Sequence, residues 1–355
     1  MKGRELEWMS PRRRFMGALL GGRVDRLAVG TPTSVATVGL MEQTGAFFPR
    51  AHMDAQAMAD LAVAGHEILG YDNVMPVFSV EQEAAALGCE VDWGDATNMP
   101  VERTHPFAEP EDVKVPEDFL DRPSIRVVLE AITLLRRHFG PKVAVVGKCM
   151  GPWTLSYHLH GVQSFLMDTI LEPDRVRRFL DVLKEVTVIF GRAQIEAGAD
   201  ALCIADHATG DLVSPGCYRD LLLPVHQELA ERLECPIVLH ICGNTTNRLE
   251  YIAQTGFDAF HFESKVDARQ AVGIVRDRIS LVGNVNNPET LLNGTPEDVR
   301  REAIYAAEAG VKIIGPECAV PLVTPVANLA AITEAIREYS RKGSSSALAS
   351  GGEAP

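Results

Sequence analysis

Three side chains in this sequence have the types and the spacing of a metal site. His240 and Cys242 are separated only by Ile241 in an apolar segment, and Cys318 follows a later apolar segment. Residues two apart on a strand point to the same face, so this imidazole and this thiol can bind one ion. One His and two Cys form a donor set that suits zinc, and three protein ligands leave a fourth position for substrate. The competing interpretation is that the three side chains pack, as single His and Cys residues at strand ends often do.

Two acidic residues are the candidate catalytic groups. Glu263 ends another apolar segment, and Asp206 precedes His207 at the end of a fourth one. Glu263 is either an exchangeable fourth ligand, a base near the metal, or an ion-pair partner of Lys265 or Arg269. Asp206 either binds a polar group of the substrate or caps the turn that follows its strand.

A zinc ion held by these donors would activate a thiol. It lowers the pKa of a bound thiol, so that a thiolate forms near neutral pH. Two protein thiolates already neutralise the ion, and a bound substrate thiolate therefore keeps its negative charge and stays nucleophilic. This favours alkyl transfer to sulfur over hydrolysis of a carbonyl, for which a more electrophilic zinc is preferred.

The segments that carry these residues must meet for such a site to exist. Short apolar runs rich in β-branched residues alternate with helical patterns, and they predict eight strands, at 26–30, 73–77, 142–147, 201–206, 237–242, 259–263, 279–284 and 311–316. Gly198, Gly256 and Gly310 lie just before three of them, where a left-handed cap lets a helix turn back into a strand. Glu81 and Glu83, after the second strand, fit equally well at the start of a solvated helix.

Eight strands alternating with helices predict parallel pairing and a (β/α)₈ TIM barrel of class α/β. The main rival is a doubly wound open sheet, whose dinucleotide-binding form has G-x-G-x-x-G after its first strand. Residues 30–35 read GTPTSV instead, so the barrel is favoured. In a barrel the carboxyl ends of the strands meet at one mouth, which is where the candidate residues belong.

The chain divides into three predicted parts. Residues 1–26 form an N-terminal helical extension, with Ser10 and Pro11 as N-cap and first helical residue. Residues 27–342 form the barrel, with an excursion rich in Pro and acidic residues at 98–123. The small, polar residues of the tail 343–355 predict disorder.

Charge and composition exclude several classes of function. The chain has 355 residues with 34 Lys+Arg and 48 Asp+Glu, a net charge of −14. This balance argues against nucleic acid or an anionic membrane as the main partner, and the basic run Arg12–Arg14 is expected on a solvated helix face. No apolar run reaches the ~18–20 residues of a membrane span. We see no secretory signal, and seven cysteines without a disulfide framework fit a reducing cytoplasm.

The sequence resembles the uroporphyrinogen decarboxylase superfamily over about residues 8–340, and within it the corrinoid-dependent methyltransferase branch of the methylcobamide:coenzyme M type. The most specific segments are VLHICGNTT at 238–246 and IIGPECAVPLVTPVANLAAITEA at 313–335. The resemblance implies a (β/α)₈ barrel. It also implies that His240, Cys242 and Cys318 bind zinc, and that Glu263 completes the zinc shell in the resting enzyme.

Two departures distinguish the chain from the decarboxylases of this superfamily. Those enzymes carry R-Q-A-G-R near the first strand, where this sequence reads SVATVGLMEQTG at 34–45. They also place an Asp after Phe-Ser near the second strand, whereas Val80 follows Phe78 and Ser79 here. Both departures count against decarboxylation of a tetrapyrrole.

The resemblance therefore implies a corrinoid (cobalamin) carried by a partner protein, which presents methyl-Co(III) to a thiol acceptor such as coenzyme M. The sulfonate of coenzyme M needs a basic or NH-rich pocket, for which Arg14, Lys148 and Arg219 are candidates beside their roles on solvated faces or in ion pairs. Three other functions stay open. These are the first half-reaction or transfer to a folate, a decarboxylase-like lyase, and a non-catalytic corrinoid chaperone.

Overall fold

The computed structural model describes the backbone of residues 7–350 and the side chains of residues 7–342. Within this part of the chain, parallel strands form an eight-stranded sheet in the order β1-β10-β9-β8-β7-β6-β5-β2. Its strands are β1 (Ala28–Val29), β2 (Asn73–Val74), β5 (Ala144–Met150), β6 (Ala201–Ala205), β7 (Ile237–His240), β8 (Ala259–Phe262), β9 (Ser280–Val285) and β10 (Ile313–Pro316). The predicted (β/α)₈ barrel is confirmed, and each strand falls on a predicted apolar run.

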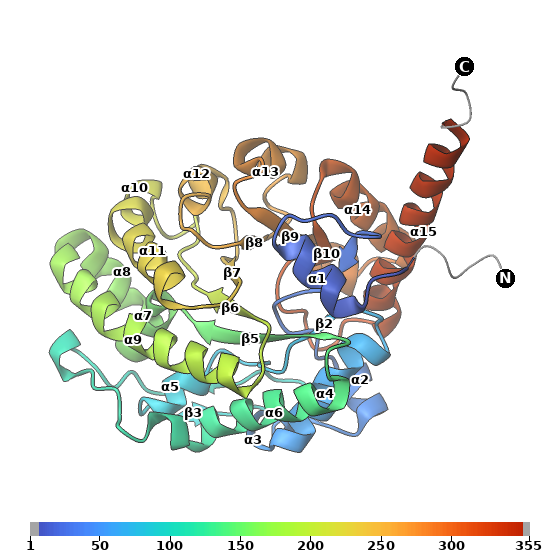
Figure 1. Ribbon diagram of the computed structural model, residues 1–355. Helices are drawn as coiled ribbons and strands as arrows, with labels where there is room; N and C mark the ends of the chain where they lie inside the picture. The colour runs from blue at the N-terminus through green and yellow to red at the C-terminus, as the bar shows by residue number, and fades with distance from the viewer. Residues whose placement is uncertain (1–6, 351–355) are drawn as a thin grey trace.

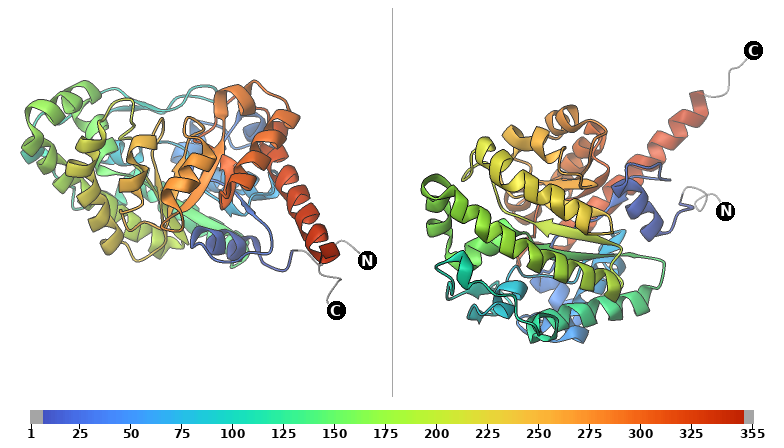
Figure 2. Two further views of the ribbon diagram at one scale, coloured as in Figure 1. Left: turned by 90° about the horizontal axis from the view of Figure 1, so that it is seen from above. Right: turned by 60° about the vertical axis from the view of Figure 1, so that its left-hand side comes forward.

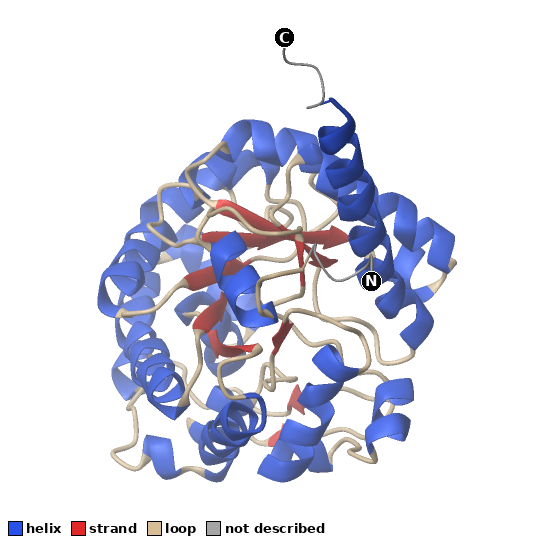
Figure 3. Cartoon of the chain, turned by 45° about the vertical axis from the view of Figure 1, so that its right-hand side comes forward, coloured by secondary structure: helices blue, strands red, loops and turns tan. Residues whose placement is uncertain are grey.

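Helices surround the sheet (Figures 1 and 3). The first half of the chain supplies α1 (Pro11–Leu19), α2 (Val38–Thr44), α3 (Arg50–Met53), α4 (Ala55–Glu67), α5 (Gln82–Ala86), α6 (Pro123–Phe139), α7 (Pro152–His160) and α8 (Val162–Leu171). The second half supplies α9 (Pro173–Ala197), α10 (Pro215–Cys217), α11 (Leu223–Arg232), α12 (Leu249–Ile252), α13 (Ala268–Val275), α14 (Pro296–Ala309) and α15 (Val326–Ser350). Single 3₁₀ or π turns occur at η1 (Pro110–Asp112), η2 (Phe119–Asp121), η3 (Tyr218–Leu222), η4 (Thr246–Arg248) and η5 (Asn287–Leu292).

The core lies inside the sheet and between the sheet and the helices. Strand β5 is buried at all seven of its positions, which is typical of a parallel strand covered on both faces. Helix α6 buries a stripe that includes Ile125, Ile132 and Leu135 while its other face meets solvent. None of the helices in the described residues combines the length and the apolar composition that crossing a membrane requires.

The barrel closes between its two shortest strands, β1 and β2, with the help of the Asn73 side chain. The backbone NH of Asp72 donates to the carbonyl of Val29 at 2.7 Å. The amide group of Asn73 then spans the gap, accepting from Thr31 N at 3.1 Å and donating to Thr31 O at 2.8 Å. The Asn73 side chain thus takes the place of ladder hydrogen bonds between β1 and β2.

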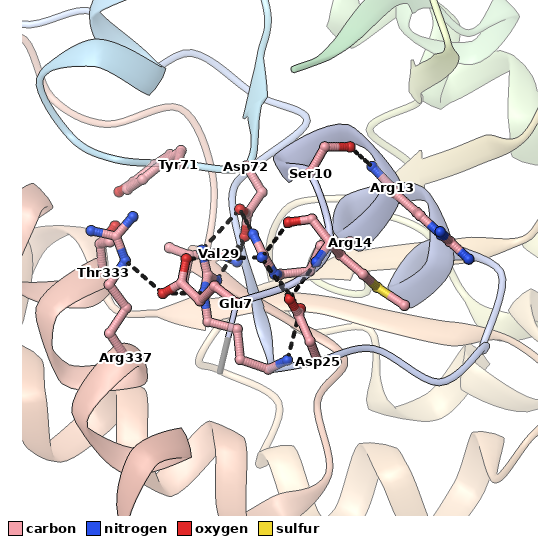
Figure 4. A network of polar contacts seen from close by, with 12 residues as sticks. Glu7, Ser10, Arg13, Arg14, Asp25, Val29, Tyr71, Asp72, Thr333 and Arg337 are labelled. Atoms are coloured by element: carbon pink, nitrogen blue, oxygen red, sulfur yellow. Dashed lines mark hydrogen bonds and ion pairs between the residues drawn. The ribbon is translucent and has the colours of Figure 1, made fainter. Parts of the chain in front are cut away.

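Helix α1 packs against the amino ends of the strands, and the predicted cap is confirmed, since Ser10 Oγ accepts from Arg13 N at 3.2 Å. Arg14 is not on a solvated face. It is 1 % exposed, and its guanidinium contacts Asp25 at 2.7 Å and Asp72 at 2.7 Å (Figure 4). The solvated-face interpretation of Arg14 was wrong and the ion-pair alternative is confirmed, because the carboxylates of Asp25 and Asp72, 11 and 58 positions further along the chain, neutralise it at the floor of the barrel.

The excursion and the tail differ from expectation in detail. The excursion between β2 and β5 includes an antiparallel hairpin of β3 (Val91–Asp92) and β4 (Val101–Glu102), followed by η1 and η2. Helix α15 extends past the ring of helices to Ser350 (Figure 2), so residues 343–350, predicted to be disordered, are helical. Residues 351–355, and residues 1–6 of the predicted extension, lie outside the described residues.

Candidate metal centre

The structure brings the three predicted ligands together at the carboxyl ends of the strands. His240 ends β7, Cys242 lies two residues further, and Cys318 lies two residues beyond β10. The Nε2 atom of His240 is 3.1 Å from Cys242 Sγ and 3.3 Å from Cys318 Sγ, and the two sulfurs are 3.2 Å apart. One nitrogen and two sulfurs therefore form a nearly equilateral triangle at the mouth of the barrel.

The surroundings of His240 prepare it as a ligand. Its Nδ1 donates to the backbone carbonyl of His261 at 3.3 Å, which leaves Nε2 directed at the two sulfurs. Burial, followed by the neighbouring His261 and His207, holds the pKa of His240 well below its ordinary value. The imidazole is therefore neutral, which is the form that binds a metal.

The thiol of Cys242 is protonated when no cation is bound. The hydrogen bond with Cys318, together with burial and the nearby charge of Glu263, raises the pKa of Cys242 well above its ordinary value. A second negative charge is disfavoured so close to the first. A divalent cation reverses this preference, because it stabilises both thiolates at once.

Zinc fits this donor set. Zn–S and Zn–N bonds of about 2.3 and 2.0 Å in a tetrahedron separate the donor atoms by about 3.5–3.8 Å. The separations between the Nε2 of His240 and the two sulfurs are 3.1–3.3 Å, so the donors need only small outward movements. A neutral imidazole and two thiols are also donors that zinc prefers over magnesium or calcium.

Two further side chains reach the triangle. A carboxylate oxygen of Glu263, just after β8, lies within 4.8 Å of the sulfurs of Cys242 and Cys318. Burial raises the pKa of Glu263, and the charge of Glu317 adds to this effect. A ring nitrogen of His207 lies equally close to the donor atoms of His240 and Cys242. His207 was not predicted as a ligand, although its position directly after β6 was a signal for that role.

Asp206 does not join this group. It is fully buried, its Oδ1 accepts from Thr154 N at 2.8 Å, and its Oδ2 is 3.0 Å from Nε2 of His226. The carboxylate therefore holds the first turn of α7 against the end of β6. Both oxygens bind inside the protein, to α7 and α11 and not to the turn that follows β6, so the predicted capping of that turn is not what the side chain does, and the contact with substrate stays a prediction.

The three predicted anion-binding residues are dispersed. Arg14 lies at the floor of the barrel, as described above, and the exposed Arg219 pairs with its neighbour Asp220 at 2.6 Å. Lys148, on β5, is 3 % exposed and interacts electrostatically with the thiols of Cys318 and Cys242. Burial lowers the pKa of Lys148. It is the one candidate of the three whose charge acts on the thiols.

Glu317 was missed as a positioning residue. Its two carboxylate oxygens accept from Ser264 N and Asn287 N, each at 2.7 Å. These bonds join the segments after β8, β9 and β10, and they fix the chain immediately before Cys318. The adjacency of Glu317 to a candidate ligand was the only signal in the sequence, and its partners became visible only in the fold.

Comparison with curated proteins finds relatives along nearly the whole chain. A methylated-thiol--coenzyme M methyltransferase of Methanosarcina mazei is 35 % identical over 332 residues, covering 93 % of this chain and 90 % of that protein. The methylcobamide:CoM methyltransferase MtaA of Methanosarcina barkeri is 36 % identical over 329 residues, covering 92 % and 97 %.

A solved structure described as a methyltransferase from Methanosarcina mazei has a TM-score of 0.91 at 36 % sequence identity, covering 93 % of this chain and 99 % of that one. The sequence profile of the uroporphyrinogen decarboxylase (URO-D) family matches residues 10–339. This span includes the barrel and every candidate ligand. The chain belongs to the uroporphyrinogen decarboxylase (URO-D) family.

Proposed function

We propose that the protein is a zinc-dependent methyltransferase that moves a methyl group between the methyl-Co(III) corrinoid of a partner protein and a thiol acceptor such as coenzyme M. The observation that carries this proposal is the convergence of His240 Nε2, Cys242 Sγ and Cys318 Sγ within 3.1–3.3 Å of one another. The relatives at 35 % and 36 % identity are coenzyme M methyltransferases, which supports both the methyl transfer and the acceptor.

His240, Cys242 and Cys318 would hold the zinc. Zinc bound there lowers the pKa of an acceptor thiol and keeps the resulting thiolate nucleophilic. Glu263 occupies the side of the triangle formed by the two sulfurs, and we propose that it moves aside as the acceptor enters. Its partly buried carboxylate, whose pKa is raised, then takes the proton that the acceptor thiol loses.

Methyl transfer is a displacement at carbon. The acceptor sulfur attacks the methyl carbon, a C–S bond forms, and the Co–C bond breaks with its electron pair remaining on cobalt as Co(I). We propose that the corrinoid approaches the triangle from the side of the two sulfurs, because Cys242 and Cys318 are partly exposed whereas His240 is 1 % exposed. Thiols 3.2 Å apart require a reducing compartment to stay free, which supports a cytoplasmic location.

The first test is the metal content of the purified chain beside Cys318→Ser and Cys217→Ser. Cys217 lies in α10, outside the triangle, and serves as the matched control. We expect about one zinc per chain in the unaltered protein and in Cys217→Ser, with loss or strong weakening in Cys318→Ser. Absence of zinc after reconstitution would overturn the proposed mechanism.

The second test is demethylation of methylcobalamin with and without an added thiol. Turnover that depends on coenzyme M, and that Cys318→Ser abolishes, supports thiol methylation. Methylation of cob(I)alamin by a methoxylated or methylamine substrate without any thiol would instead assign the first half-reaction. Activity on uroporphyrinogen without zinc would assign a lyase.

A further inference from the structure

A second group of metal-ligating side chains lies apart from the His–Cys triangle. Glu81 immediately precedes α5, Glu102 ends β4, and His158 lies in the last turn of α7. His158 Nδ1 is 3.3 Å from Glu81 Oε2 and 3.4 Å from Glu102 Oε1. One donor atom from each residue lies within 4.8 Å of the other two. We call these three residues the Glu–His–Glu cluster.

Two of the donor atoms are buried without a hydrogen-bond partner. Glu81 is 2 % exposed and His158 is 7 % exposed, and neither Glu81 Oε2 nor His158 Nδ1 makes a hydrogen bond. They lie 3.3 Å apart, yet their orientation does not satisfy the geometry of a hydrogen bond. A buried polar atom without a partner is costly, and such an atom calls for an explanation such as a bound ion.

The charge of the cluster also favours a divalent cation. When no metal is bound, Nδ1 of His158 forms ion pairs with both carboxylates. A divalent cation that replaces the proton of this imidazole would neutralise both carboxylates at once, because it carries two positive charges where the imidazolium carries one.

We propose that Glu81, Glu102 and His158 bind a second divalent transition-metal cation, zinc or manganese, through two carboxylate oxygens and one imidazole nitrogen. This donor set differs from the His–Cys triangle because it contains no sulfur, and N/O donors suit zinc and manganese. Glu81 and His158 belong to segments that follow β2 and β5, whereas Glu102 belongs to the β3–β4 hairpin. A cation there would fasten the hairpin to the barrel.

The inference is tested in the full chain carrying both Cys242→Ser and Cys318→Ser, which disables the triangle and makes this test independent of the proposed function. Zn²⁺ and, separately, Mn²⁺ are titrated at about pH 8 by calorimetry, with metal content measured after dialysis. We expect about one ion per chain. Glu102→Gln should weaken binding at least tenfold, while Glu90→Gln, an exposed carboxylate before the same hairpin, should leave it unchanged.

Hydrogen exchange in the β3–β4 hairpin gives a second measure of cation binding. Added zinc should slow hydrogen exchange in residues 91–102 of the double-serine chain, and Glu102→Gln should abolish this effect. Glu102 is only partly buried, so its substitution tests binding even where Glu81→Gln fails to fold. A double-serine chain that binds neither metal, or a Glu102→Gln chain that binds as tightly as its parent, would overturn the inference.

Discussion

At the scale of single residues, Glu263 differs from His240, Cys242 and Cys318 because its donor atom is a carboxylate oxygen. Its carboxylate lies near both sulfurs, and its negative charge contributes to the raised pKa of Cys242. The three N/S donors are sufficient to hold zinc. The carboxylate therefore tunes affinity and handles the proton of the acceptor, and it is not needed for retention of the metal.

We predict that Glu263→Gln retains about one zinc per chain but binds it roughly tenfold more weakly, since an amide is a poorer ligand than a carboxylate. Competition with a chromogenic chelator measures this affinity. Glu289→Gln, an exposed carboxylate in η5, is the control and should match the unaltered chain. An affinity equal to that of the control would exclude Glu263 from the metal shell.

For Asp206 we expect an effect on stability and none on zinc binding. Because its oxygens bind Thr154 N and His226 Nε2 inside the protein, Asp206→Asn should lower the free energy of unfolding by about 1–3 kcal/mol. Zinc content should stay unchanged. Urea denaturation and metal analysis measure the two effects. Unchanged stability together with lost methyl transfer would support the catalytic role that the sequence suggested.

Which functional residues lie at the strand ends could be predicted more reliably than which residues they contact. His240 and Cys242 were identified because side chains alternate along a strand, and Cys318 because the ends of parallel strands share one mouth. The burial of Asp206 depends on the position of α7, and that of Arg14 on carboxylates brought in by folding. Neither partner is near in sequence, so no local pattern carried the information.

At the scale of elements, the strand β10 that leads to Cys318 passes very close to β1. A Cβ atom at Gly315 would lie 2.1 Å from the carbonyl oxygen of Gly30, which is backbone and cannot rotate away. The approach of β10 to β1 thus requires glycine at this position. Gly273 in α13 offers a contrast, because a Cβ there would meet nothing within 4 Å.

We predict opposite effects of the same substitution at these two positions. Gly315→Ala should destabilise the fold by about 2 kcal/mol or more, because strands must move apart, and it should weaken zinc binding by displacing Cys318. Gly273→Ala should stabilise the fold by about 0.5–1 kcal/mol, since alanine favours an exposed helix. Thermal unfolding and zinc titration check both. A Gly315→Ala chain as stable as the parent would contradict the tight packing of β10 on β1.

Most elements of the barrel could be predicted because each strand is a short apolar run placed between helices with recognisable ends. The hairpin β3–β4 could not, because its strands are partly exposed and lie in no apolar run, whereas the equally short β1 and β2 are fully buried. The closure of the barrel between β1 and β2 could not be predicted either. It depends on the side chain of Asn73, whose role exists only once the barrel has formed.

At the scale of the whole molecule, the two ends of the barrel have different tasks. The thiols and imidazoles gather at the carboxyl ends of the strands, whereas the amino ends are covered by α1 and an ion-pair network of Arg14, Asp25, Asp72 and Arg26 (Figure 4). This division is general in TIM barrels, in which one face supports stability and the other performs chemistry. The network also joins α1 to the segments where the barrel closes.

The pH dependence of the free energy of unfolding tests the stabilising role of the amino end, through the carboxylate of Asp25. Burial tends to raise its pKa, but hydrogen bonds from Arg14 and from the backbone of Met9 outweigh it, so the pKa lies below the ordinary 3.8. A carboxyl whose folded-state pKa is depressed contributes stability that is fully present above its unfolded pKa. That contribution disappears as the pH falls through the folded-state pKa.

We predict that Asp25→Asn lowers the free energy of unfolding by about 3 kcal/mol near neutral pH, because it leaves a buried guanidinium with one carboxylate fewer. The difference from the unaltered chain should shrink as the pH falls below 3.8, where the unaltered chain also begins to lose this charge. Urea unfolding between about pH 7 and pH 3 measures it, with exposed Asp277→Asn as the control. Zinc content should not change, because the network lies at the opposite end of the barrel from the triangle. A stability difference that is independent of pH would mean that Asp25 acts through packing and not through its charge.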